Sequence, residues 1–209
     1  MTVWFANEYP DAAVNYYTSE DADTVDVQVL DSAIIFTDDN ASSMSLVSDI
    51  PGANCTHTNS TTITCPTHAT ETDNGNDRRV LNVGVITWAG DDTITASGRG
   101  WTYGSTYRPI QLNIGSWEGD DTITSTGGLQ MVTAGDGNDT IVSGPGPAAG
   151  AGPQFTDRLD GGAGDDTIDA YTNSGDVDGI YCRAGSDKVT VNSTDLLYDS
   201  ANCESVTTH

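Results

Sequence analysis

The chain has 209 residues, 36% of them hydrophobic, and no apolar run reaches the about 20 residues that a membrane-crossing helix needs. Its 31 acidic residues, 26 of them aspartate, outnumber 7 basic residues and give a formal charge of −24 at pH 7. This charge excludes nucleic-acid binding, which depends on Lys and Arg. It fits either a disordered, solvated chain or a protein that collects cations. The preference for Asp over Glu favours turns over long helices.

Residues 1–80 are predicted to form a β-rich N-terminal cap. Val25, Val27 and Val29 alternate with polar residues, as in a strand with one buried face, and residues 33–37 form a second apolar run. The first ten residues lack the basic start and the apolar core of a secretory signal peptide.

The chain has four cysteines, which are Cys55, Cys65, Cys182 and Cys203. Their spacing does not fit a zinc knuckle, and pairing of the first with the second and of the third with the fourth is the simplest of three connectivities. Each such disulfide would stabilise the fold by about 3 kcal/mol in the chain-entropy model. Disulfides imply an oxidising, extracellular destination, whereas four buried thiols in a cytosolic protein are the alternative. His57 and His68 flank the first pair, but no third metal ligand accompanies them.

Five segments from residue 88 onward share a Gly-Asp motif that is followed by an apolar residue. They span 88–94, 117–123, 134–141, 161–168 and 183–189. The second acidic position of the motif holds Asp92, Asp121, Asp139, Asp166 and Asp187. An apolar residue stands two positions after and seven positions before each of these aspartates. This spacing predicts a strand, a tight turn and a second strand, with one residue of each strand pointing inward.

One such unit cannot bury its own inner face, so the units are expected to stack at the about 4.8 Å spacing of neighbouring strands. The sequence therefore predicts an all-β protein: a parallel β-solenoid (a β-roll or β-helix) of about five coils over residues 81–209. The disulfides would tie the two ends, and the solenoid and the N-terminal cap would form one continuous domain. Residues 99–108 and 144–153 are expected to form loops on the side away from the turns.

Stacked turns would place carboxylates about 5 Å apart, where they repel by a few kcal/mol at an effective dielectric near 20. Ca2+ between turns would reverse this effect, because it accepts about six to eight oxygens from carboxylates and from carbonyls that glycine turns can bring inward. Mg2+ fits less well because it keeps its waters. The predicted ligands are Asp91, Asp92, Asp120, Asp121, Asp136, Asp139, Asp165, Asp166 and Asp187, with Gly90, Gly119, Gly135, Gly137, Gly162, Gly164 and Gly185. Turns without metal are the alternative, since Gly and Asp are favoured in any turn.

Residues 161–169, Gly-Gly-Ala-Gly-Asp-Asp-Thr-Ile-Asp, resemble the calcium-binding nonapeptide of RTX (hemolysin-type) proteins at every fixed position. Residues 134–142 depart from it only in Ala134, and the other units depart further. The chain also resembles secreted calcium-binding β-roll proteins of actinobacteria, with a β-rich cap, a short Cys loop and then Gly-Asp repeats. This resemblance implies a calcium-dependent extracellular module that binds several ions.

We expect a structural or surface module without catalytic activity, extracellular or at the cell surface, whose folding is coupled to leaving the low-calcium cytosol. A surface protein of a bacteriophage virion, for decoration or in the tail, is an alternative motivated by Met1 without a signal peptide. A carbohydrate-binding or polysaccharide-processing β-helix protein is the third hypothesis.

Aromatic residues and arginines gather at two places. Trp88 and Trp117 share one repeat position, which predicts a ladder of stacked like residues or, as the alternative, a platform for a sugar. The second place, residues 99–108, has the composition of a binding hot spot for a protein or a glycan, unless its aromatics only pack on the solenoid. Its candidate binding residues are Arg99, Trp101, Tyr103, Tyr107 and Arg108.

Overall fold

The computed structural model describes residues 12–18, 22–39, 45–48, 55–67, 80–99, 101–103, 106–145, 156–172 and 177–209. These residues contain twenty β-strands and one short 3-10 helix, η1 (Ser200–Asn202), and no α-helix. The all-β class predicted from the sequence is confirmed. Within the same ranges, no helix is long and apolar enough to cross a membrane.

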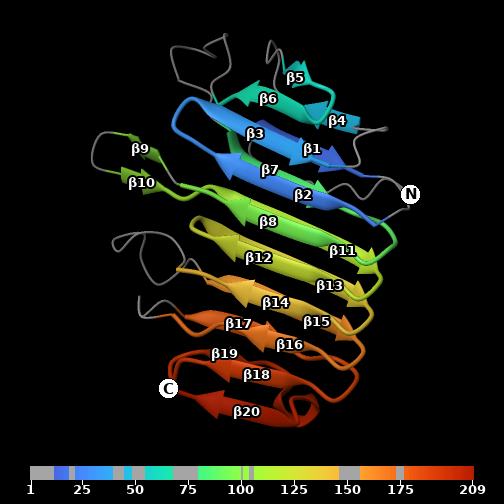
Figure 1. Cartoon of the computed structure of the whole chain (residues 1–209). Coiled ribbons are helices and arrows are strands. Elements are labelled where there is room, and N and C mark those ends of the chain that lie inside the picture. The colour runs from blue at the N-terminus through green and yellow to red at the C-terminus, as the bar shows by residue number, and fades with distance from the viewer. Residues whose placement is uncertain are drawn as a thin grey trace.

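Two large sheets contain most of the strands (Figure 1). The first sheet has eight strands in the order β19-β17-β15-β13-β11-β7-β1-β4. Their bounds are β1 Ala12–Tyr17, β4 Ser45–Ser48, β7 Val80–Ile86, β11 Gln111–Glu118, β13 Leu129–Asp136, β15 Asp157–Ala163, β17 Asp178–Tyr181 and β19 Leu196–Leu197. The second sheet has ten strands in the order β20-β18-β16-β14-β12-β8-β2-β3-β6-β5. Their bounds are β2 Thr24–Val29, β3 Ala33–Asp38, β5 Thr56–Asn59, β6 Thr62–Pro66, β8 Thr93–Ser97, β12 Thr122–Thr126, β14 Thr140–Ser143, β16 Thr167–Asp169, β18 Lys188–Val191 and β20 Ser205–Thr208.

The chain alternates between the two sheets and so forms seven strand pairs, each with one strand in either sheet. The pairs are β1–β2, β7–β8, β11–β12, β13–β14, β15–β16, β17–β18 and β19–β20. Corresponding strands of successive pairs run parallel. Figure 1 shows the turns within the pairs stacked above one another on its right-hand side. Residues far apart in the sequence therefore form columns that run across the strands.

The register aligns the apolar residues that the sequence pattern singles out. In six of the pairs, an inward residue of the first strand precedes an inward residue of the second by nine positions, and β19–β20 has apolar residues at the same spacing. These couples are Tyr16 and Val25, Val85 and Ile94, Ile114 and Ile123, Val132 and Ile141, Leu159 and Ile168, Ile180 and Val189, and Leu197 and Val206. All but the last couple are buried in one hydrophobic core. The Gly-Asp motif predicts five of the pairs, and the structure adds β1–β2 and β19–β20.

The two ends of the stack differ in strand direction. At the N-terminal end, β3 pairs antiparallel with β2 and β6, and β4 pairs antiparallel with β1. There the disulfide between Cys55 and Cys65 ties the antiparallel strands β5 and β6. At the C-terminal end, the disulfide between Cys182 and Cys203 links the last two strand pairs. Both predicted disulfides are confirmed.

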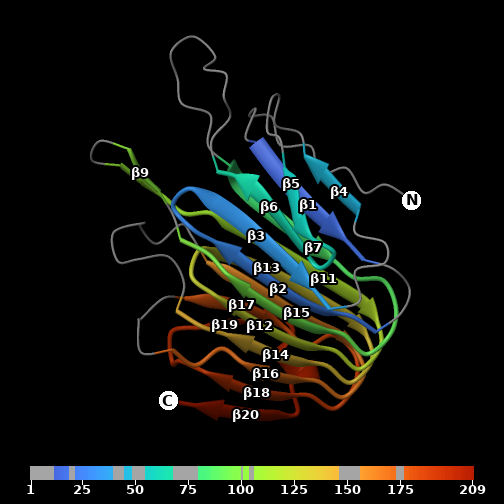
Figure 2. The same cartoon turned by 45° about the horizontal axis from the view of Figure 1, so that its top comes forward.

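A small hairpin of β9 (Trp101–Tyr103) and β10 (Thr106–Arg108) forms a separate antiparallel sheet. It lies on the side away from the turns, as the sequence predicts (Figures 1 and 2). Arg99, just before it, is exposed. The side chains of the other predicted binding residues, Trp101, Tyr103, Tyr107 and Arg108, lie outside the part that the structure describes, as do residues 146–155 of the second predicted loop.

Candidate metal centre

Each of the five predicted turns is built around a glycine with positive φ. Gly90, Gly119, Gly137, Gly164 and Gly185 occupy equivalent positions, and their φ angles lie between 107° and 143°. A Cβ atom on any of the last four would stand 1.8–2.1 Å from the carbonyl oxygen of the equivalent glycine in the preceding turn. Only glycine permits such close stacking of backbone. The two further predicted glycines, Gly135 and Gly162, also have positive φ.

The second acidic residue of each turn points into the turn, and we call these residues the inner row. They are Asp92, Asp121, Asp139, Asp166 and Asp187, each at most 1% exposed. One oxygen of each, Oδ1, accepts a hydrogen bond of 2.8–2.9 Å from the backbone N–H of the equivalent acidic residue in the preceding turn. The inner row is therefore a continuous ladder of buried carboxylates along the stack.

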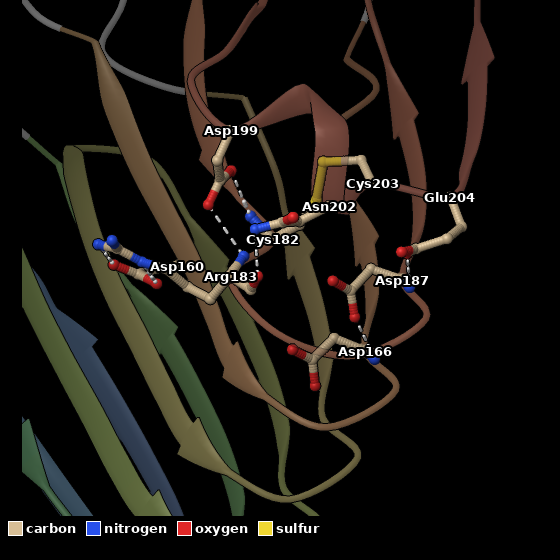
Figure 3. Close-up of a disulfide and its surroundings, with 9 residues drawn as sticks. All are labelled: Asp160, Asp166, Cys182, Arg183, Asp187, Asp199, Asn202, Cys203 and Glu204. Atoms are coloured by element: carbon tan, nitrogen blue, oxygen red, sulfur yellow. Dashed lines mark hydrogen bonds and ion pairs between the residues drawn. A yellow bond between two sulfur atoms is a disulfide. The ribbon is translucent and has the colours of Figure 1, made fainter.

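Asp23 and Glu204 extend this ladder at its two ends. The backbone N–H of Asp23 donates to Asp92, and the backbone N–H of Asp187 donates to Glu204 Oε2 at 2.8 Å (Figure 3). Both residues were missed from the sequence because neither follows a Gly-Asp motif. They keep the spacing of the other turns, however, since each stands two residues before a valine, the buried Val25 or the exposed Val206, which is in register with Val189. That spacing is the signal that would have found them.

The second carboxylate oxygen of every inner-row aspartate has no hydrogen-bond partner. Oδ2 is buried and unpaired in Asp92, Asp121, Asp139, Asp166 and Asp187. Asp166 Oδ2 lies only 2.4 Å from the point where a Cβ on Gly161 would stand, so the lack of a side chain at Gly161 leaves room beside it. A buried charge without compensation is strongly unfavourable. The inner row therefore requires protons or a bound cation.

Burial raises the pKa of all five inner-row aspartates. The pKa rises from 3.8 to about 6 for Asp92 and Asp139 and to about 7 for Asp166. The hydroxyl groups of Thr87 beside Asp92 and of Ser116 beside Asp121 oppose this rise, as do hydrogen bonds from the backbone along the row. The charges of neighbouring carboxylates add to the rise. In the absence of a cation, Asp92, Asp139 and Asp166 therefore take up protons as the pH falls through about 7 to 6.

The residues one position earlier form an outer row that faces solvent. They are Asp91, Asp120, Asn138, Asp165 and Ser186, and all are exposed. Oδ1 of each of the first four accepts a hydrogen bond of 2.7–3.0 Å from the backbone N–H of the next member along the chain. These bonds run in the opposite direction to those of the inner row. Because Asn138 and Ser186 stand where other turns have aspartate, the outer row does not need a carboxylate in every turn.

Asp136, the remaining predicted ligand, belongs to neither row. It is exposed at the end of β13, in register with Glu118 and Ala163. Among the predicted carboxylates, the structure thus brings five together in the inner row and three in the outer row.

Another group of metal-ligating residue types lies at the last turn and consists of Cys182, Asp199 and Cys203. The two sulfurs are bonded to each other, so they offer no thiolate to a metal. The Asp199 carboxylate accepts hydrogen bonds of 2.9 Å from the backbone N–H groups of Cys182 and Arg183 (Figure 3). This group therefore ties the last strand pair to the stack and is not a metal centre.

The aromatic pair predicted from the repeats lies on the surface. The rings of Trp88 and Trp117 stack with centroids 5.8 Å apart and planes 22° apart, as a ladder of like residues requires. His57 is exposed on β5, and His68 lies outside the described residues.

Comparisons with known proteins assign no family to this chain, because no family model, no curated protein and no solved structure matches it. The resemblance of residues 161–169 to the calcium-binding nonapeptide therefore stays a prediction.

Proposed function

We propose that the seven strand pairs form a parallel β-solenoid that calcium stabilises, and that the protein is an extracellular structural or surface module without catalytic activity. Five buried aspartates, each with one unpaired carboxylate oxygen, carry this proposal. A divalent cation between successive turns would partner these oxygens and reverse the repulsion within the row.

The available donor atoms fit calcium better than other common metals. Oδ2 of the inner row supplies carboxylate oxygens, and the glycine turns supply backbone carbonyls close to the next turn. Ca2+ accepts such a mixture in flexible geometry, whereas Zn2+ favours nitrogen and sulfur and Mg2+ favours an octahedron rich in water. The residues that would hold calcium are Asp92, Asp121, Asp139, Asp166 and Asp187, together with the turn glycines.

Calcium binding would couple folding to location. In a compartment with little calcium, the carboxylates of the inner row would repel one another. Where calcium is abundant, the bound ions would stabilise the folded state, since a ligand that binds only the folded state stabilises it. Two disulfides agree with an oxidising, extracellular destination. The function would be rigidity and the display of surface segments such as the β9–β10 hairpin.

Thermal unfolding in EDTA and in millimolar calcium tests this proposal. One site at 100 times its Kd adds about 2.7 kcal/mol, and for a chain of this size each kcal/mol raises Tm by about 2–4 °C. We expect calcium to raise Tm by more than about 5 °C. Equal Tm values in the two buffers would contradict the proposal.

The same measurement on Asp166→Asn separates calcium from protons. An amide carries no charge and donates hydrogen bonds, so this variant should be at least as stable as the wild type in EDTA and should gain less from calcium. Asp165→Asn in the exposed outer row is the matched control and should keep the full gain. If Asp166→Asn raises Tm by the same amount in both buffers, protons and not calcium neutralise the row.

A further inference from the structure

One column on the outer face of the eight-stranded sheet carries side chains at its two ends and none in its middle. Strand register aligns its five members, Trp88, Trp117, Gly135, Gly162 and Arg183, at the start of five successive turns. The column lies apart from the inner row, which points into the turns.

Two members of this column hold a strained backbone. Trp117 and Arg183, with φ of 77° and 70°, are the only non-glycine residues of the described chain with positive φ. Gly135 and Gly162, between them, have positive φ without strain, so glycine satisfies the backbone at this position. Large side chains that persist at strained positions indicate a function carried by those side chains.

At one end, Trp117 presents an aromatic surface. Trp88 stacks on one side of the Trp117 indole. The next member of the column, Gly135, has no side chain that could cover the other side of the indole. Trp117 is 48% exposed, and its Nε1 lies 3.5 Å from the point where a Cβ on Gly115 would stand. The indole therefore extends over the outer face of the sheet and remains accessible.

At the other end, Arg183 belongs to a fixed polar and aromatic cluster. Its Nε and Nη2 donate to the two oxygens of Asp160 at 2.9 and 2.6 Å, and Arg158 Nη2 donates to the same carboxylate at 2.9 Å. The two guanidinium groups lie 4.5 and 4.9 Å from the centre of the Tyr181 ring, which stacks on Tyr198. Figure 3 shows Arg183 reaching Asp160 on the side of the chain away from the inner row.

This cluster is rigid and still accessible. Burial alone would raise the pKa of Asp160, but the hydrogen bonds from the two arginines outweigh it and lower that pKa, so the carboxylate stays ionised. The side chains of Arg158 and Arg183 are 43% and 46% exposed, so part of each guanidinium is free to bind other groups.

We propose that the surface from Trp117 to Arg183 binds an uncharged polysaccharide that runs across the strands. The two residues are three strand spacings apart, about 14 Å, with Gly135 and Gly162 between them. The indole suits the C–H face of a sugar ring, and the arginines and Asp160 offer donors and an acceptor to its hydroxyl groups. The net charge of −24 disfavours polyanions, including acidic glycans.

Trp117→Gly is a sharp test because it installs the residue that Gly135 and Gly162 already have at this position. The change removes the aromatic surface and relieves the strained backbone, so the fold and Tm should be kept. Binding in millimolar calcium would be measured by titration calorimetry with soluble β-glucan, xylan and starch. Pectate and oligolysine serve as charged probes, and Trp88→Ala is the matched aromatic control.

We expect the wild type to bind at least one neutral polymer, Trp117→Gly to bind it at least tenfold more weakly, and Arg183→Gly to lose affinity as well. Trp88→Ala should lose less because Trp88 only supports the back of the indole. The proposal is overturned if the wild type binds none of the three neutral polymers, or if Trp117→Gly binds equally well. Binding confined to oligolysine, abolished by salt and unchanged in Trp117→Gly, would reflect the overall charge and would also overturn it.

Discussion

The inner and outer rows consist of residues that are adjacent in the chain but lie in opposite environments. Inner-row aspartates are at most 1% exposed, and each keeps one unpaired oxygen and has a raised pKa. Outer-row residues are exposed, and two turns have Asn138 or Ser186 in place of aspartate. The position within the turn, and not the abundance of aspartate, therefore decides which carboxylates need a counter-ion.

Backbone hydrogen bonding adds to this difference. Both rows accept N–H groups from a neighbouring turn, but the inner-row bonds lie in the protein interior and the outer-row bonds lie at the surface. Removing an inner carboxylate leaves a buried N–H without a partner, whereas water can replace an outer one. The following predictions use this contrast.

Gly164→Ala should have the largest effect because it disturbs both rows at once. Gly164 has φ of 133°, and a Cβ there would stand 2.0 Å from the Gly137 carbonyl oxygen. We expect a loss above about 4 kcal/mol, or failure to fold. Gly115→Ala is the control, since it has no positive φ and its nearest contact is at 3.5 Å. Equal urea midpoints for the two variants would show that the glycine stacking does not set the rows.

Without calcium, titration of the inner row should make stability depend on pH. The folded pKa values of Asp92, Asp139 and Asp166 lie above 3.8, so their contribution is full below that pH and is lost as pH rises through about 6 to 7. We expect the free energy of unfolding in calcium-free buffer to fall between about pH 4 and pH 7.5. The fall should be on the order of 3 kcal/mol, less than the sum of the separate shifts, because coupled groups do not add.

Asp166→Asn should flatten part of this pH dependence. Asp165→Asn should change it much less, because Asp165 acts on the inner row only as a neighbouring charge. Equal flattening by both variants would remove the distinction between the rows.

In millimolar calcium, the free energies of unfolding of Asp166→Ala and Asp165→Ala should differ by a smaller amount than the effects described above. The first change orphans the buried N–H of Asp139, so we expect a loss of about 2–3 kcal/mol. The second exposes the N–H of Ser186 to water, so we expect less than about 1 kcal/mol. Chemical unfolding measures both values, and a larger loss for Asp165→Ala would reverse the assignment of the two rows.

Much of the inner row could be predicted from the sequence because its turns keep a fixed length. A constant spacing of nine residues between inward apolar positions encloses each inner-row aspartate. The period of two along a strand also separates the rows, since Asp121 shares its parity with inward Ile123 and Asp120 does not. Asp136 was predicted as a ligand because it lies in the repeat segment 134–141, although it does not stand two residues before an inward apolar residue.

The outer-face cluster could not be predicted in this way. Asp160 and Arg183 belong to different strand pairs and are joined only by the register of β15 and β17. The repeat spacing gives that register through Leu159 and Ile180, but it does not show which way the side chains on the outer face turn. The antiparallel direction of β3 and β4 is equally absent from the repeat pattern, because it arises where the repeats end.

Calcium titration of EDTA-treated protein, followed by calorimetry, tests the central claim most directly. The wild type would be compared with an inner-row double variant, Asp139→Asn with Asp166→Asn, and an outer-row double variant, Asp120→Asn with Asp165→Asn. We expect saturable calcium binding by the wild type and the outer-row variant, with fewer sites or weaker binding in the inner-row variant. Absence of binding by the wild type, or identical isotherms for the wild type and the inner-row variant, would contradict it.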